Sequence, residues 1–145
     1  MIALLQRVTQ ARVAIEGATV ASISQGLLAL IGVRPGDNQL SATRLLDRVL
    51  KYRVFADAGG KMNLSLAQVG GGLLLVPQFT LAADTRKGLR PGFSTAAAPE
   101  VGRPLFEFLV AAARKQHPLV ECGVFGAHMQ VSLVNDGPVT IWLES

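Results

Sequence analysis

Leu73-Leu74-Leu75-Val76-Pro77-Gln78-Phe79-Thr80-Leu81 is an apolar run of strand length that ends abruptly in polar and conformationally restricted residues. Four consecutive aliphatic residues preceded by a run of glycines predict a strand that is buried on both faces. Proline then ends regular pairing, because it has no backbone N–H. Functional residues are often carried on the loops that leave a rigid scaffold. We therefore predict a buried strand at residues 73–76 and a functional segment directly after it.

Residues 129–143 repeat this arrangement near the other end of the chain. An apolar run at 129–134 leads into Asn135-Asp136-Gly137-Pro138-Val139-Thr140, and residues 139–143 are again mostly apolar. Asn, Asp, Gly and Pro in succession mark a turn, so we predict two strands joined through residues 135–138. From spacing alone, a Gly-Pro pair between two strands is an ordinary turn.

The rest of the sequence adds strands and two helices. Aliphatic and β-branched runs predict strands at 2–9, 12–15, 19–24 and 27–33, most simply arranged as an antiparallel meander. Asn38 is a good N-cap, and apolar residues follow it at helical spacing as far as Leu50. A second helix is predicted at 99–117, where Pro99 and Pro104 fit only near the first turn. We predict one domain over residues 1–145, of α+β class, with a mainly antiparallel sheet or open barrel and two covering helices.

Composition excludes several classes of protein. Half of the 145 residues are hydrophobic and 17% are charged, which excludes disorder, and no apolar run is long enough to cross a membrane. We recognise no signal peptide, and Cys122 is the only cysteine, so we expect a cytoplasmic protein without an internal disulfide. The net charge of +4 permits a polyanionic partner. Arg86, Lys87 and Arg90 gather in a loop containing glycine and proline, and they are either phosphate contacts or a solvated surface.

Few side chains are equipped for acid–base or metal chemistry. The motifs of serine hydrolases, zinc proteins and P-loop nucleotide triphosphatases are absent, and we predict no metal and no cofactor. His117 and His128 are the only histidines, and we interpret both as structural, with His117 at a helix end. Thr80 has no identifiable base nearby, so a covalent threonine mechanism is the less favoured alternative. We expect Gln78, Phe79 and Thr80 instead to supply backbone N–H donors to a developing oxyanion.

The two segments resemble the signature motifs of the D-aminoacyl-tRNA deacylases, which hydrolyse the ester joining a D-amino acid to its tRNA. The resemblance extends to residues 1–8, 60–64, 78–85 and the last fifteen residues, and so covers essentially the whole chain. It implies a D-aminoacyl-tRNA deacylase-like fold and a homodimer. The chain departs from the family at Pro77, where serine is usual. Because Gln78, Phe79 and Thr80 are kept, we interpret Pro77 as tolerated variation that stiffens the loop.

The resemblance also implies roles for the second segment. The Gly137-Pro138 peptide bond would be cis, and its carbonyls would reach into the active site of the other subunit to accept hydrogen bonds from the substrate's α-ammonium. An L side chain would then collide with backbone, whereas D-amino acids and glycine would fit. Arg7 either braces this loop or is a surface charge. Phe125 and Met129 either line the pocket or pack in the core.

We therefore expect a hydrolase that releases D-amino acids from tRNA, with glycyl-tRNA as a side substrate and with the vicinal ribose hydroxyl of the RNA assisting water. Two alternatives stay open. One is editing of L-aminoacyl-tRNA, since the chain also resembles a domain of archaeal threonyl-tRNA synthetases that removes L-serine. The other is a non-catalytic RNA-binding protein that uses the loop at residues 86–90, with salt-dependent binding and no ester cleavage.

Overall fold

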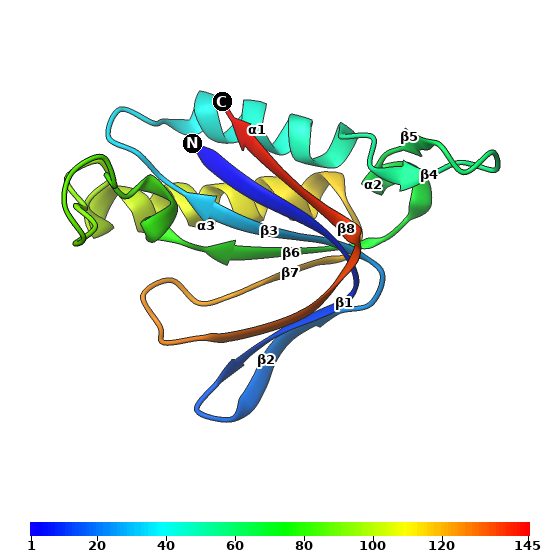
Figure 1. Ribbon diagram of the computed structural model, residues 1–145, viewed down its shortest axis with the longest axis horizontal. Helices are drawn as coiled ribbons and strands as arrows, with labels where there is room; N and C mark the ends of the chain where they lie inside the picture. Colours follow the sequence, from blue (N-terminus) through cyan, green and yellow to red (C-terminus); the bar gives the residue numbers. More distant parts are fainter.

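The computed structural model describes residues 1–145 and has α+β architecture with a nearly closed sheet (Figure 1). Its helices are α1 (Gln39–Lys51), α2 (Leu66–Val69) and α3 (Pro99–Gln116), together with a short 3-10 helix, η1 (Phe79–Ala82). Its strands are β1 (Ile2–Ile15), β2 (Ala18–Ile23), β3 (Gly26–Gly32), β4 (Phe55–Ala56), β5 (Met62–Leu64), β6 (Gly72–Pro77), β7 (Val120–Cys122) and β8 (Gln130–Glu144). The predicted fold class is confirmed, and α2 is an additional helix that the sequence pattern did not indicate.

β1 is the central strand of the sheet, and it is longer than predicted. It runs unbroken over fourteen residues, and β8 pairs antiparallel with it along nearly its whole length. On its other side β1 pairs antiparallel first with β3 and then with β2. The prediction of two separate strands at 2–9 and 12–15 was wrong. Gln10 and Ala11 continue the strand because Val134 and Leu133 of β8 lie opposite them.

The sheet is not a simple meander, because β6 and β7 join it in parallel. β6 pairs with β3 from Gly26 opposite Gly72 to Ile31 opposite Pro77, and β7 pairs with β6. Parallel neighbours need a crossover connection, which α1 supplies between β3 and β6, and α3 between β6 and β7. The antiparallel prediction therefore holds around β1 and is wrong for these two pairs.

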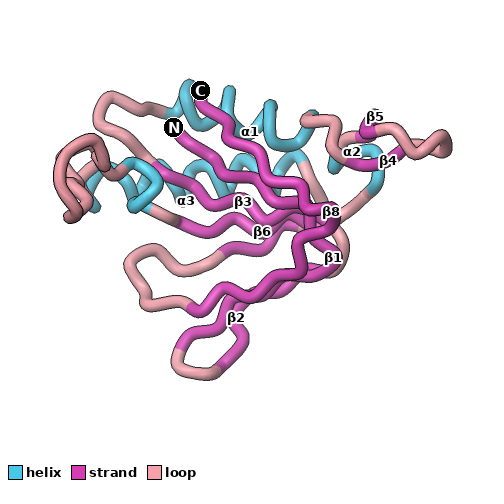
Figure 2. The backbone as a smooth tube through the Cα atoms, viewed as in Figure 1, coloured by secondary structure: helices cyan, strands magenta, loops and turns pink.

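Helices α1 and α3 cover one face of the sheet (Figure 2), as predicted for two covering helices. Their apolar sides and the strands beneath them form a core of 24 buried residues, in which Leu45 and Val49 of α1 are almost completely buried. Asn38 caps α1, as predicted. Its side-chain oxygen accepts hydrogen bonds from the N–H groups of Leu40 and Ser41 at 3.0 and 3.1 Å, which satisfies two of the free donors at the helix start.

Helix α3 begins at Pro99 and is capped at its end by His117. The His117 ring is buried, and its Nε2 lies 2.7 Å from the carbonyl oxygen of Gly71 at the start of β6, in agreement with a structural role. Pro104 lies inside the helix beyond the first turn, so the expectation that it fits only near that turn was wrong. The carbonyl that it leaves without a partner belongs to Glu100, and both residues are exposed to water. None of the helices is long and apolar enough to cross a membrane.

The other face of the sheet holds a smaller cluster of seven buried residues. β3 and β6 approach closely there, since a Cβ on Gly26 would lie only 1.9 Å from the carbonyl oxygen of Gly72. Met129, just before β8, and Val131, at its start, pack against this cluster and are partly buried. The close approach fixes the position of β6, whose end carries the first predicted functional segment.

Candidate active site

The segment that follows β6 is held in one conformation by hydrogen bonds. The N–H of Gln78 donates to the carbonyl of Ile31 at 2.7 Å, so this donor is not free for a ligand. The side-chain amide of Gln78 donates to the hydroxyl oxygen of Thr80 at 2.5 Å. Phe79 and Thr80 open η1, so their N–H groups have no acceptor within that helix, and no loop carbonyl accepts from either. Two of the three predicted donors are therefore unpaired.

A cavity of about 660 Å³ lies beside this segment. Gln78 and Phe79 form one part of its wall, and Phe125, His128 and Met129 form another, so two stretches that are far apart in the sequence meet here. Most of the lining is hydrophobic, and the volume is typical of a small-molecule site. His128 was interpreted as structural, but it is exposed and lines the cavity. Thr80 does not line it.

Part of the wall was not predicted from the sequence. Phe93 lines the cavity together with the segment that leads into α3, and its ring centroid lies 5.0 Å from that of Phe79. Phe93 belongs to an irregular stretch between η1 and α3. Without helical or strand periodicity, its apolar character alone gave no indication of where the side chain would lie.

Phe125 and Met129 serve both of the roles that the sequence left open. Each lines the cavity, and each also packs against a buried cluster. The ring of Phe125 lies 6.4 Å from that of Phe106 in α3, and the guanidinium carbon of Arg103 lies 5.1 Å from the Phe125 centroid. A Cβ on Gly123 would approach the sulfur of Met129 to 2.8 Å, so this glycine allows Met129 to close against the backbone.

The second predicted segment is a bulge within one strand, and the prediction of a turn between two strands was wrong. β8 is continuous, with Asn135 opposite Val8 and Thr140 opposite Gln6, so residues 136–139 lie opposite Arg7 alone. The residues before and after the bulge both pair with β1. The Gly-Pro pair in the sequence cannot reveal this shared partner. β8 bends at this point (Figure 2). The peptide bond between residues 137 and 138 is cis, as the resemblance implied.

Arg7 holds this bulge in place. Its Nε donates to the carbonyl of Asp136 at 2.9 Å, and its Nη1 donates to the carbonyl of Val54 at 2.5 Å. The carboxylate of Asp136 lies 3.3 Å from the same Nε. Only 15% of the Arg7 side chain is exposed, so it is an internal anchor of the bulge and not a surface charge.

The bulge and the cavity are far apart within one chain. Arg7, Gly137 and Pro138 do not line the cavity. In Figure 1 the cavity segment follows the arrowhead of β6, whereas the bend of β8 lies at the opposite end of the sheet. Gly137 and Pro138 are both exposed. Within a single chain, their carbonyls therefore do not reach the cavity.

The basic loop is closed by a pair of backbone hydrogen bonds between Asp84 and Gly92, at 2.8 and 2.9 Å. Arg86 is engaged inside it: its Nε and Nη2 donate to the two carboxylate oxygens of Asp84 at 2.8 and 2.7 Å. These hydrogen bonds hold the pKa of Asp84 well below its usual range. Lys87 and Arg90 are exposed and form no ion pair, so they are the free cations of the loop.

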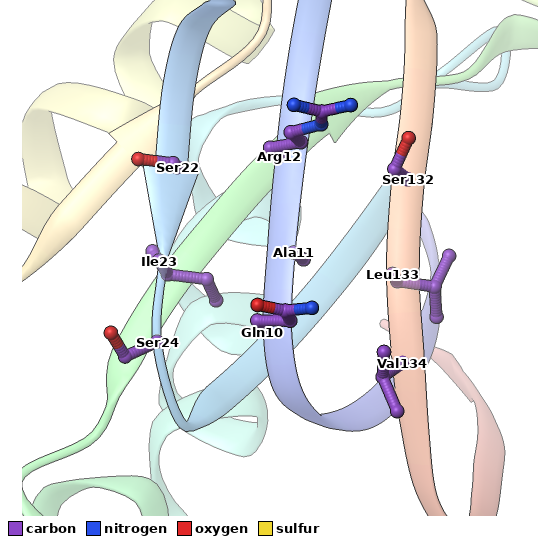
Figure 3. Close-up of a pocket in the computed structure, with 9 residues that line it drawn as sticks. All are labelled: Gln10, Ala11, Arg12, Ser22, Ile23, Ser24, Ser132, Leu133 and Val134. Atoms are coloured by element: carbon purple, nitrogen blue, oxygen red, sulfur yellow. The ribbon is translucent and has the colours of Figure 1, made fainter.

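A second cavity, of about 540 Å³, lies across β1, β2 and β8 (Figure 3). Its polar lining residues are Gln10, Arg12, Ser22, Ser24 and Ser132. It contains one charged group, Arg12, and no predicted site residue. No three His, Cys, Asp or Glu side chains in the structure lie close enough together to hold a metal ion. The cavity beside Gln78 is therefore the better candidate for an active site.

Known proteins resemble this chain along its whole length. The family model described as D-Tyr-tRNA(Tyr) deacylase matches residues 4–144. The D-aminoacyl-tRNA deacylase of Thioalkalivibrio sulfidiphilus is 63% identical over 144 residues, covering 99% of this chain and 97% of that protein. The D-aminoacyl-tRNA deacylase of Azotobacter vinelandii is 63% identical over 145 residues, covering all of both chains.

Two solved structures are also similar. A chain described as c-Myc DNA Unwinding Element Binding Protein superimposes with a TM-score of 0.96 at 37% identity, covering 100% of this chain and 99% of that one. A structure titled as a probable eukaryotic D-amino acid tRNA deacylase has a TM-score of 0.84 at 16% identity, covering 99% and 98% of the two chains. At that identity the second similarity concerns the fold alone.

Proposed function

This chain belongs to the D-Tyr-tRNA(Tyr) deacylase family, and we propose that it hydrolyses the ester bond between a D-amino acid and tRNA, releasing both. The observation that carries the proposal is a mostly apolar cavity lined by Phe79, whose backbone N–H is unpaired, as is the N–H of the adjacent Thr80. The cavity suits the acyl group of an aminoacyl ester. The N–H groups suit the oxygen of its carbonyl, on which negative charge develops during hydrolysis.

Water attacks the carbonyl carbon, and the tetrahedral oxyanion is stabilised by the N–H groups of Phe79 and Thr80. Each such donor is worth about 3 kcal/mol of transition-state stabilisation. The intermediate then expels the ribose oxygen, which takes up the proton that the attacking water has lost. The hydrogen bond from the Gln78 amide orients the Thr80 hydroxyl, so Thr80 acts by position and not as a covalent nucleophile. The vicinal ribose hydroxyl of the substrate positions or deprotonates the water, which suits a site with few acids and bases.

Chirality is selected by the carbonyls of Gly137 and Pro138 from a second copy of the chain, so the active enzyme is a homodimer. The support is that the bulge is exposed, is anchored by Arg7 and lies away from the cavity of its own chain. These carbonyls accept hydrogen bonds from the substrate's α-ammonium, which leaves no room for an L side chain. Rejection by collision places no demand on the D side chain, so many D-amino acids are accepted, and glycyl-tRNA is also cleaved.

The basic loop between Asp84 and Gly92 contacts the phosphates of the tRNA. A cytoplasmic protein meets tRNA readily, and its net charge of +4 favours approach to this polyanion. Lys87 and Arg90 make these contacts, because both are exposed and unpaired. Arg86 keeps the loop closed through Asp84.

A deacylation assay on matched D- and L-tyrosyl-tRNA, with and without a chelator, tests the proposal. We expect rapid release of D-tyrosine, no release of L-tyrosine and no effect of the chelator. Equal turnover of both enantiomers would overturn D-selectivity, and faster turnover of L-seryl-tRNA would favour L-specific editing. Salt-dependent tRNA binding without any cleavage would indicate a non-catalytic RNA-binding protein.

A further inference from the structure

A groove adjoins the candidate active site on the far side of Phe125. Its volume is about 340 Å³, and α3 forms one side of it while the segment after β7 forms the other. Phe125 lines both this groove and the active-site cavity, so the two spaces are separated by one aromatic ring. A ligand that extends from the cavity over that ring enters the groove.

Two arginines from α3 lie along this groove. Arg103 and Arg114 are about three turns, or about 16 Å, apart on one side of the helix. The guanidinium of Arg103 lies over the ring of Phe125, and Nη2 of Arg114 lies 3.7 Å from the sulfur of Cys122. Both arginines are exposed, and neither forms an ion pair. Glu107 also lines the groove between them.

We propose that this groove binds the phosphates of the single-stranded 3′ end of the substrate RNA, through Arg103 and Arg114. The inference rests on the proposed function, which places the terminal aminoacyl-adenosine in the adjoining cavity. Sites for single-stranded nucleic acid combine unpaired cations with aromatic rings along a groove, as Arg103, Arg114 and Phe125 do here. Arginine suits phosphate because its planar fork can donate two hydrogen bonds at once.

Kinetics of charge-removing variants test the groove, with D-tyrosyl-tRNA and D-tyrosyl-adenosine as substrates. The second substrate lacks the RNA phosphates. Arg114→Gln should raise KM for D-tyrosyl-tRNA about five-fold, the upper range for an exposed ion pair, and much more than for D-tyrosyl-adenosine. For Arg114→Gln, the slope of the logarithm of the tRNA binding constant against the logarithm of salt concentration should fall in magnitude by about 0.7. Glu107→Gln should have the opposite effect and lower KM, because it removes a like charge from the path of the phosphates.

Arg44→Gln is the matched control, since Arg44 is an exposed and unpaired arginine on α1 that does not line this groove. Arg103→Lys keeps the positive charge but removes the planar guanidinium that lies over Phe125. It should therefore retain the salt dependence of tRNA binding, which Arg103→Gln should lose in part. The proposal is overturned if Arg114→Gln behaves like Arg44→Gln, or if it affects both substrates equally. It is also overturned if a polyglutamate peptide competes with D-tyrosyl-tRNA for binding as well as tRNA without an amino acid does. Failure of the unmodified protein to cleave either D-ester would instead refute the proposed function.

Discussion

Gly137→Ala is the sharpest single test of the bulge in β8. Gly137 has a φ of +137°, which a residue with a side chain rarely adopts. A Cβ there would lie 2.8 Å from Cγ2 of Val139, 3.0 Å from the backbone N of Val139 and 3.1 Å from Nη2 of Arg7. The methyl of Val139 can rotate away. The backbone N of Val139 cannot, and Arg7 is held by two carbonyls.

The expected loss of stability has two parts. Placing alanine at this φ costs about 1–2 kcal/mol. Displacing Arg7 weakens hydrogen bonds from a charged group, which costs about a further 1.5–3 kcal/mol. The total of about 2.5–5 kcal/mol should lower Tm by roughly 8–16 °C in a chain of this length. Deacylation of D-tyrosyl-tRNA should fall as well, because the carbonyls that we propose to contact the substrate would move.

Gly36→Ala provides the matched control. Gly36 also has a positive φ, +87°, but a Cβ there would meet nothing within 4 Å. It should therefore show the conformational cost alone, about 1–2 kcal/mol, with unchanged deacylation. Urea unfolding and the D-tyrosyl-tRNA assay on both variants separate the two contributions. If Gly137→Ala were no less stable than Gly36→Ala and equally active, the account of a bulge fixed by Arg7 would be refuted.

Arg7→Ala should lower the free energy of unfolding by about 2–4 kcal/mol and reduce deacylation, because two carbonyls lose a charged donor; an unchanged urea midpoint would contradict this. Asn38→Ala should cost about 1 kcal/mol in urea unfolding through loss of the helix cap, with kcat/KM unaffected. Asp57, Asp84 and Glu144 each accept hydrogen bonds from neighbouring side chains that lower their pKa. Their stabilising effect is therefore complete above about pH 5 and is lost as the pH falls below about 4, so thermal scans should show Tm falling only at the acid end. Asp57→Asn should reduce that fall, and a Tm that declined between pH 8 and 6 would count against this assignment.

Local signals account for the parts of the fold that the sequence predicted well. The cap at Asn38 and the spacing of Leu45 and Val49 are contained within α1 itself. Likewise, the aliphatic run of β6 predicts burial without reference to any partner. Pairing is different, because nothing in residues 27–33 or 73–76 distinguishes a parallel neighbour from an antiparallel one. The register of β8 on β1 depends on contacts between the two ends of the chain, which single-sequence patterns do not contain.

The candidate site divides in the same way. Gln78, Phe79, Phe125 and Met129 were identified through their motifs or their resemblance to a family, and they meet at one cavity. Phe93 had no such signal. The hydrogen bond that occupies the Gln78 N–H was also unpredictable, since its acceptor lies in β3, far away in the sequence.

The pairing of β1 with β8 has a consequence for synthesis on the ribosome. β1 emerges well before its partner along one whole edge, which consists of residues 130–144. Until those residues emerge, that edge offers unpaired N–H and C=O groups to any other extended chain nearby. The guanidinium of Arg7, which anchors the bulge, likewise has no acceptor at Asp136 until then. The pairing of β1 with β8, and with it the anchoring of the bulge by Arg7, therefore forms only after residues 130–144 have been synthesised.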